Sequence, residues 1–157
     1  MPETSPIRPT DDAARTLARG LMTKARFGAL GVPSDGAPMV TRVAVGVIGA
    51  SPVILVSDLS AHTSALKISP VASLLVGEPG PRGDPLTHPR LTLQVRAAPA
   101  EKPACREAWL AFHPKSALYI DFADFLFFRL DVMEAHLNGG FGKAYRLTPE
   151  DLASGAP

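Results

Sequence analysis

Cysteine, long apolar runs and an excess of one charge are all scarce in this chain of 157 residues. The one cysteine, Cys105, has no partner for an internal disulfide and no C-x-x-C spacing, which excludes a disulfide-bonded secreted framework. No apolar stretch is long enough to span a bilayer, and the N-terminal segment M-P-E-T-S-P-I-R-P-T lacks the apolar core of a signal peptide. We therefore expect a cytoplasmic protein that does not act at a membrane.

The charges are nearly balanced: 16 basic and 15 acidic residues give a net charge of +1, and the two signs are interspersed. Interspersed charges leave no basic patch that would attract a polyanion, so we do not expect nucleic-acid binding. Hydrophobic residues make up 46% of the chain and charged residues 20%, which is typical of a globular protein of one domain. We expect a flexible N-terminal arm over residues 1–10, which is rich in proline, and a single domain over residues 11–157.

Several common active-site motifs are absent as well. The sequence has no G-x-G-x-x-G, no G-x-x-x-x-G-K-[ST] phosphate loop and no G-x-S-x-G elbow of a serine hydrolase. Its four histidines, at positions 62, 88, 113 and 136, lack metal-ligand spacing, so we expect no metal site. Cys105 lies in a predicted helix and is interpreted as an inert, partly buried thiol.

The hydrophobic pattern predicts a mainly β protein. Apolar residues at helical spacing predict a helix over 11–25, and shorter helices are expected over 62–68, over 103–113 and from 148 onward. Strands are predicted over 27–32, 39–48, 52–56, 71–76, 90–97 and 125–137, with a last one after the glycine-rich bend that begins at residue 138. Residues 77–89, rich in proline and glycine, are expected to form a surface loop with neither helix nor strand. Short links between the first four strands favour an antiparallel barrel or sandwich with helices outside it.

An unusual number of hydrogen-bond donors follows the strand at 52–56, in the stretch S-D-L-S-A-H-T-S-A-L-K over residues 57–67. Thr63 and Ser64 stand at the start of a short helix, where hydroxyls and backbone N–H groups can bind an anion, and Lys67 follows one turn later. The alternative is a plain capped turn whose side chains meet only water. The residues alone leave both interpretations open.

Two arginines add to this pattern. Arg42 lies in M-V-T-R-V-A-V, among residues that are expected to be buried, and a guanidinium there needs an acidic partner, a route to solvent or a bound anion. Its planar fork suits a phosphate, and an Asp or Glu partner is the competing explanation. Arg90 is the first residue of the strand predicted after the loop at residues 77–89. Like Arg42, it is a strand arginine that could bind an anion.

Taken in order, these segments resemble the pyridoxamine 5′-phosphate oxidase-like family of flavin-binding split barrels, in particular its haem-utilisation branch. The resemblance rests on M-V-T-R-V-A-V, V-S-D-L-S-A-H-T-S-A-L-K-I-S-P-V-A-S-L-L-V, H-P-R-L-T-L-Q-V, H-P-K-S-A-L-Y-I-D-F-A-D-F-L-F-F-R-L and G-G-F-G-K-A. It implies a six-stranded antiparallel split β-barrel with flanking helices, mainly β in class, and a homodimer that holds FMN at the subunit interface.

The resemblance also implies which residues hold the cofactor. Arg42 would bind the FMN phosphate, the backbone of Val43 and Ala44 would face the isoalloxazine, and Arg90 would approach the flavin ring. The remaining cofactor contacts would come from Ser57, His62, Thr63, Ser64 and Lys67. Members of the family usually carry a basic residue in or just after the H-T pair, which this chain lacks, so its phosphate grip would depend more on Arg42.

We therefore expect an FMN-dependent oxidoreductase whose catalytic residues and small-molecule substrate the sequence does not name. Haem binding or haem degradation on the same barrel is the alternative, although the larger haem-degrading relatives carry an added C-terminal segment with an axial histidine. A non-enzymatic split-barrel dimer is a further possibility.

Overall fold

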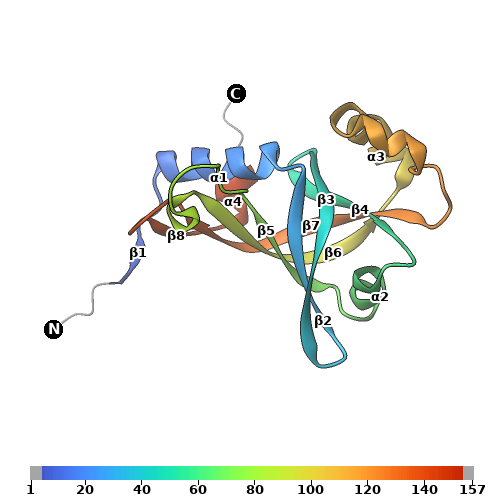
Figure 1. The fold of residues 1–157 in the computed structure, drawn as a ribbon, viewed down its shortest axis with the longest axis horizontal. Helices are drawn as coiled ribbons and strands as arrows, with labels where there is room; N and C mark the ends of the chain where they lie inside the picture. The colour runs from blue at the N-terminus through green and yellow to red at the C-terminus, as the bar shows by residue number, and fades with distance from the viewer. Residues whose placement is uncertain (1–4, 154–157) are drawn as a thin grey trace.

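The computed structural model describes residues 5–153 (Figure 1). Its elements, in chain order, are β1 (Ile7–Arg8), α1 (Asp12–Lys24), β2 (Phe27–Ser34), β3 (Ala37–Ile48), β4 (Ser51–Ser57), α2 (Ala61–Ile68), β5 (Val71–Val76), the 3₁₀ turn η1 (Pro85–Thr87), β6 (Arg90–Ala100), α3 (Lys102–Phe112), the 3₁₀ turn η2 (Pro114–Leu118), β7 (Phe125–Asn138), β8 (Ala144–Leu147) and α4 (Pro149–Ala153). All the predicted helices and strands are present, within a few residues of their expected bounds.

Six strands close into an antiparallel barrel in the order β7-β4-β3-β2-β5-β6, because β6 pairs back onto β7. Strand β8 extends the sheet beyond β7, and β1 adds a short parallel edge to β8. The expected fold class, a mainly β split barrel with flanking helices, is confirmed. A two-residue turn joins β2 to β3, where Asp35 and Gly36 have φ values of 51° and 80°, as the hairpin twist requires.

The barrel is filled by the inward side chains of alternate strand residues, among them Leu30, Val45, Leu74, Leu93 and Leu137. A second apolar cluster lies outside the barrel wall, under α3. There Trp109 packs edge-on against Phe127, with ring centroids 5.3 Å apart. Cys105 belongs to this cluster, and burial raises the pKa of its thiol, as expected for an unreactive cysteine.

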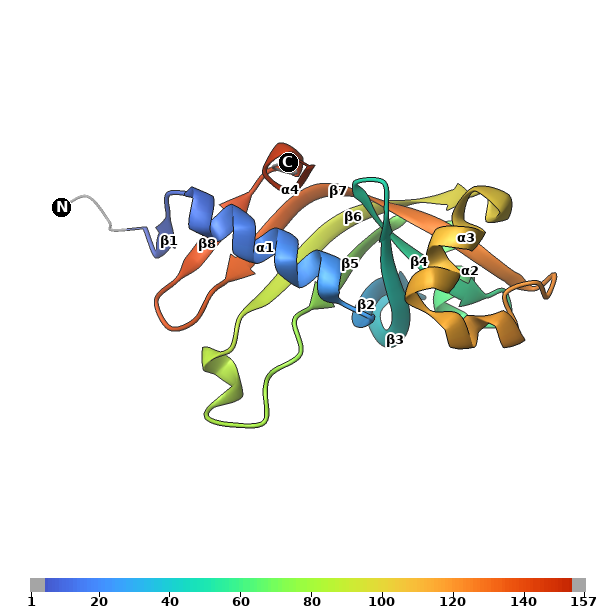
Figure 2. The same cartoon turned by 90° about the horizontal axis from the view of Figure 1, so that it is seen from above.

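Helix α1 lies across one end of the barrel, and α2 and α3 lie toward the other end (Figure 2). The carboxylate of Asp11 caps α1 by accepting from the backbone N–H of Ala14 at 2.8 Å. Ala14, Ala18 and Met22 bury one face of the helix against the barrel core. Arg15 joins α1 to α4 through an ion pair with Asp151 at 2.7 Å.

The prediction that residues 77–89 contain no helix is wrong over Pro85–Thr87, which form one 3₁₀ turn. Pro85 supplies the φ value that the turn needs, and the carboxylate of Asp84 accepts from the N–H of Leu86 at 2.9 Å. The rest of the segment is a loop, as expected.

Part of the expected N-terminal arm, residues 1–4, lies outside the described residues. Within the described part, Ile7 and Arg8 pair with Ala144 and Tyr145 of β8. The division of the chain into an arm and one domain stays a prediction. None of the helices in residues 5–153 has both the length and the apolar character needed to cross a membrane.

Candidate functional site

The strand register aligns residues of six strands in one row across the outside of the barrel. In this row Arg42 pairs with Ala29, Ala29 with Leu75, Leu75 with Thr92, Thr92 with His136, and His136 with Arg146. Directly paired residues of antiparallel strands point to the same face of a sheet. Residues from distant parts of the sequence therefore meet on one outward face, and β3 and β5 bring Arg42 and Leu75 within two strands of each other.

An open groove of about 430 Å³ lies on this face, between β3 and the end of β5. Its lining combines the apolar side chains of Phe27 and Leu75 with the charged side chains of Arg42 and Glu78. Its volume falls within the range of small-molecule sites. Gly28 allows β2 and β5 to approach here, since a Cβ on it would lie 2.8 Å from the carbonyl oxygen of Leu75.

Arg42 is the cation of the groove. Its guanidinium carbon lies 5.4 Å from the ring centroid of Phe27, within the range of a cation–π contact. Among the residues that the structure describes, Arg42 makes no hydrogen bond and no ion pair, so the Asp or Glu partner considered from the sequence is absent there. An exposed guanidinium with free donors beside an aromatic ring can bind a carboxylate or phosphate group.

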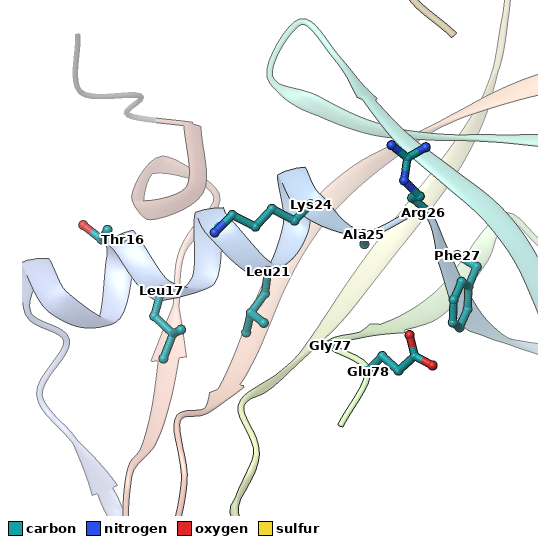
Figure 3. A pocket seen from close by; sticks show the side chains of 10 residues that line it. Thr16, Leu17, Leu21, Lys24, Ala25, Arg26, Phe27, Gly77 and Glu78 are labelled. Atoms are coloured by element: carbon teal, nitrogen blue, oxygen red, sulfur yellow. The ribbon is translucent and has the colours of Figure 1, made fainter. Parts of the chain in front are cut away.

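A second cavity, of about 560 Å³, lies between α1 and the start of the loop that follows β5, at Gly77 and Glu78 (Figure 3). It shares Phe27, Gly77 and Glu78 with the groove as lining residues, so the two spaces adjoin each other. We refer to the groove and this cavity together as the cleft.

Arg90 lies behind the wall of this cleft. Its guanidinium donates to the carbonyl oxygens of Leu86 at 3.0 Å and His88 at 3.3 Å, and thereby fastens the loop to the start of β6. Gly77 adopts a φ of 105°, and a Cβ on it would lie 2.8 Å from the Cα of Arg90. Gly77 thus lies against Arg90 on one side and lines the groove of Arg42 on the other.

The predicted site residues that follow β4 are brought together, but they bond mainly to one another. Thr63 is fully buried and its hydroxyl donates to the carbonyl oxygen of Ser57 at 2.6 Å. The hydroxyl of Ser57 accepts from the N–H of Leu59 at 3.2 Å. Lys67 forms an ion pair with Asp58. Ser60 is the N-cap of α2 and makes no side-chain capping bond.

Ser64 is exposed, and its hydroxyl makes no hydrogen bond to the described residues, while its backbone N–H donates to the carbonyl oxygen of Ser60 at 3.3 Å. Val43 is buried in the barrel core, and Ala44 packs against the cluster under α3. The ladder between β3 and β4 begins at Ala44 and Leu55, so these strands separate just before Ala44 along β3.

His62, on α2, reaches β3 where β3 and β4 separate. Its Nδ1 lies 3.0 Å from the hydroxyl of Thr41. Burial lowers the pKa of His62, which keeps the ring neutral at pH 7. Because Thr41 and Arg42 are consecutive strand residues, their side chains leave β3 on opposite faces. The structure therefore separates the α2 residues from Arg42 and does not merge them into one cradle.

Two other histidines are held by internal contacts. Nδ1 of His88 accepts from the N–H of Gly80 at 2.6 Å, and its Nε2 lies 2.7 Å from the carbonyl oxygen of Arg82. Nε2 of His113 lies 2.7 Å from the carbonyl oxygen of Val45. Both rings fasten backbone segments and have little freedom to bind a ligand.

His136 differs because it stands on the outward face. Its Nε2 lies 3.4 Å from a carboxylate oxygen of Glu134, which also pairs with Arg146 at 3.1 Å. Two strand spacings, about 10 Å, separate it from Leu75 in the groove. Over residues 5–153, no group of three or more His, Cys, Asp or Glu side chains is arranged to hold a metal ion.

Comparison with known proteins identifies relatives that are similar to this chain in sequence and in fold. No family model matches the chain. Over 99 residues it is 36% identical to the non-canonical heme oxygenase HOZ, chloroplastic, of Arabidopsis thaliana, a match that takes in 60% of this chain and 29% of the plant protein. The solved heme binding protein of Mycobacterium smegmatis superposes with a TM-score of 0.78 at 29% identity, over 94% of this chain and 62% of that one. A further solved chain is 41% identical, with a TM-score of 0.84 over 92% of this chain and 99% of that one.

A Listeria innocua protein provisionally named a pyridoxamine 5′-phosphate oxidase shares the fold, with a TM-score of 0.67 at 12% identity, over 80% of this chain and 98% of that one. The chain belongs to the pyridoxamine 5′-phosphate oxidase-like split-barrel family, in its haem-utilisation branch. It spans less than two thirds of the length of the plant and mycobacterial relatives. Flavin-binding and haem-binding proteins both occur on this fold.

Sequence reasoning missed the apolar half of the cleft. The sequence pattern predicts Phe27 and Leu75 only as strand residues and Glu78 only as part of a loop. No local signal marks them, since Leu75 reaches the groove only through the pairing of β5 with β2. Exposure of a large side chain is visible only in the folded chain, where Phe27 is 41% exposed and Leu75 is 42% exposed.

Proposed function

We propose that this protein binds haem in the cleft beside Arg42 and that it acts in haem binding or haem degradation. The observation that carries the proposal is the free guanidinium of Arg42 above the ring of Phe27, at the edge of an apolar groove. Haem is a flat apolar macrocycle with anionic propionate groups, and the groove offers both kinds of surface. The names of the plant and mycobacterial relatives support this ligand.

The residues of the cleft fit such a group by their chemistry. Arg42 would hold a propionate through its N–H donors, and Phe27 and Leu75 would cover the macrocycle and exclude water. His136 would be the histidine available to the iron, since it shares the outward face, and Glu134 would orient its ring. Bound haem supplies iron for oxygen chemistry, and the protein supplies its binding and orientation.

A homodimer is part of this proposal. Apolar side chains gather on the outward face, including Val40, which is 68% exposed, and Leu75. A second copy that covered this face would enclose the groove and exclude water from the ligand. Analytical ultracentrifugation should give twice the mass of the chain, and a monomer at micromolar concentration would contradict this part of the proposal.

The test of ligand identity is a spectroscopic titration. Haem added to the purified protein should give a saturable shift of the Soret band with one site per chain. The absence of a saturable shift would overturn the proposal. Bound haem that disappears under a reductant and oxygen, with release of a linear tetrapyrrole, would identify degradation and separate it from binding alone.

FMN is the second candidate, and a specific observation favours it. None of the described residues that line the cleft is a histidine, cysteine or methionine, so an iron ligand would have to reach in from elsewhere. FMN needs no such ligand, and its phosphate would suit Arg42. In this case the protein would be an FMN-dependent oxidoreductase, with Val43, Ala44, Ser57, His62, Thr63, Ser64, Lys67 and Arg90 as the further contacts that the family resemblance implies.

Quenching of flavin fluorescence on titration with the protein measures this alternative directly. Saturable quenching without any haem binding would replace haem by FMN as the ligand. A Ser64→Ala variant with weakened FMN binding would assign the phosphate to the start of α2, because Ser64 is the exposed hydroxyl there. A protein that binds neither haem nor FMN would be a non-enzymatic split barrel.

A further inference from the structure

We propose that Glu78 sets the charge selectivity of the groove: its carboxylate opposes negative charge beside Arg42 and thereby limits the number of anionic groups that the groove accepts. This inference rests on the part of the proposed function that places an anionic group of the ligand at Arg42. It deepens that function by naming a second residue that decides which ligands bind. It applies to haem and to FMN alike, since either ligand brings an anionic group to Arg42.

Arg42 and Glu78 are the charged side chains that line the groove. Both are exposed, and within residues 5–153 neither side chain forms a hydrogen bond or an ion pair. Phe27 lies in the same lining, and its ring contacts the guanidinium of Arg42. The carboxylate of Glu78 is directed to the side on which Phe27 lies (Figure 3). The groove therefore holds one free cation and one free anion, and a ligand that enters it meets both.

The position of Glu78 is fixed by its two neighbours in the chain. Gly77 has a φ of 105°, and a Cβ on it would lie 2.8 Å from the carbonyl oxygen of Pro89, so the chain packs closely against the start of β6. Pro79 follows, and the residue before a proline is restricted to extended backbone conformations. The negative charge is thus a built-in feature of the groove.

Two further cations lie near Glu78, but neither forms an ion pair with it. Lys24 lines the cavity under α1 together with Glu78, and no ion pair joins them in the part of the chain that the structure describes. Arg26 donates to the carbonyl oxygen of Phe112 at 2.5 Å and lies over the ring of Phe112. Because the Coulomb contributions of separate charges add, the carboxylate of Glu78 still lowers the affinity for an anion at Arg42.

The test compares Glu78→Gln with a control, Glu107→Gln. Glutamine keeps the size and an acceptor oxygen of glutamate and removes the charge. Glu107 is exposed on α3 and lines neither the groove nor the cavity under α1, so its substitution makes the same change in net charge elsewhere. At low ionic strength Glu78→Gln should raise the affinity for haem or FMN about two- to fivefold, and Glu107→Gln should leave it unchanged. The gain should disappear in about 1 M salt, which screens the charges.

Uncharged analogues show whether the effect is one of charge. Riboflavin lacks the phosphate of FMN, and haem dimethyl ester lacks the carboxylates of haem, so Glu78→Gln should leave the affinity for these analogues unchanged. Its melting temperature should match that of the wild type, because Glu78 is exposed and unpaired in the described structure. Wild-type protein that binds haem or FMN, with a Glu78→Gln variant that gains no affinity or gains as much for the uncharged analogue, would overturn this inference alone. Wild-type protein that binds neither ligand would overturn the proposed function as well.

Discussion

The segment after β4 and the outward groove use their polar side chains in opposite ways. After β4, the hydroxyl of Thr63 bonds to the backbone of Ser57, and Lys67 pairs with Asp58. In the groove, Arg42 has no hydrogen-bond partner among the described residues and contacts only an aromatic ring. Most polar side chains of the donor-rich segment after β4 therefore bond within the chain. The groove has few hydrogen-bond donors, but the guanidinium of Arg42 is free to bind a ligand.

The difference teaches that a count of donors in a sequence does not measure the capacity to bind. Buried polar groups must be paired, so a polar stretch that folds into the interior uses its donors internally. A free donor at an exposed apolar surface is the stronger sign of a ligand site. The comparison predicts that groove substitutions change binding and that substitutions after β4 change mainly stability.

The largest effect is expected for Arg42→Ala. Loss of charge-assisted hydrogen bonds worth about 1.5–3 kcal/mol should weaken haem or FMN by roughly 10- to 100-fold. Stability should hardly change, since Arg42 is exposed and unpaired in the described structure. The measurement is the ligand titration together with thermal unfolding.

A matched control for Arg42→Ala is Arg129→Ala. Arg129 is also an exposed strand arginine, and it pairs with Asp131 at 2.7 Å, away from the cleft. Its removal should leave ligand affinity within about twofold, because a surface pair contributes little. Equal losses in the two variants would mean that the arginines act only through general charge.

The next effect is expected for Thr63→Val, which keeps the shape of the buried side chain and removes its hydroxyl. The carbonyl oxygen of Ser57 loses one of two donors, since it also accepts from the N–H of Ser60 at 3.1 Å. The free energy of unfolding should fall by about 1 kcal/mol, measured by urea denaturation. Ligand affinity should stay unchanged.

A Thr63→Val variant that keeps its stability and loses ligand affinity would contradict the conclusion that the segment after β4 serves mainly stability. It would mean that the hydroxyl contacts the ligand, as the family resemblance implies for this position. Thr63→Ser is the control, since it keeps the donor and should bind and fold with smaller changes.

Most of the fold could be predicted because its signals are local. The apolar spacing along residues 11–25, the Asp35–Gly36 turn and the alternation in β6 each act within a few residues. Arg42 could also be found, since a charge among valines is conspicuous. Phe27 and Leu75 could not, because they reach the cleft through strand pairing that the sequence does not display.

A smaller effect, on pH dependence, is expected from His62. Burial lowers its folded-state pKa below the unfolded value of about 6.5, so the folded protein favours the neutral ring. The unfolded chain then binds the proton more readily, and stability is lost as the pH falls below about 6.5 toward the folded pKa. Urea denaturation between pH 7.5 and 5 should show this loss, and His62→Gln should flatten it.

His88→Gln is the control for the pH profile. His88 lies in the loop, and its ring bonds to Gly80 and Arg82. A profile that flattens in His88→Gln and persists in His62→Gln would place the acid sensitivity in the loop at the groove and not in the segment after β4.

The smallest effect is expected for Lys67→Ala. Lys67 and Asp58 form an ion pair whose side chains are 50% and 43% exposed, and solvent screens such pairs strongly. Its loss should lower the free energy of unfolding by less than about 0.5 kcal/mol. Because Asp58 already neutralises the ammonium group, ligand affinity should change by less than about twofold, measured by the same titration. A loss as large as that of Arg42→Ala would mean that Lys67 leaves Asp58 for the ligand, and the anion would then lie at α2 and not in the groove.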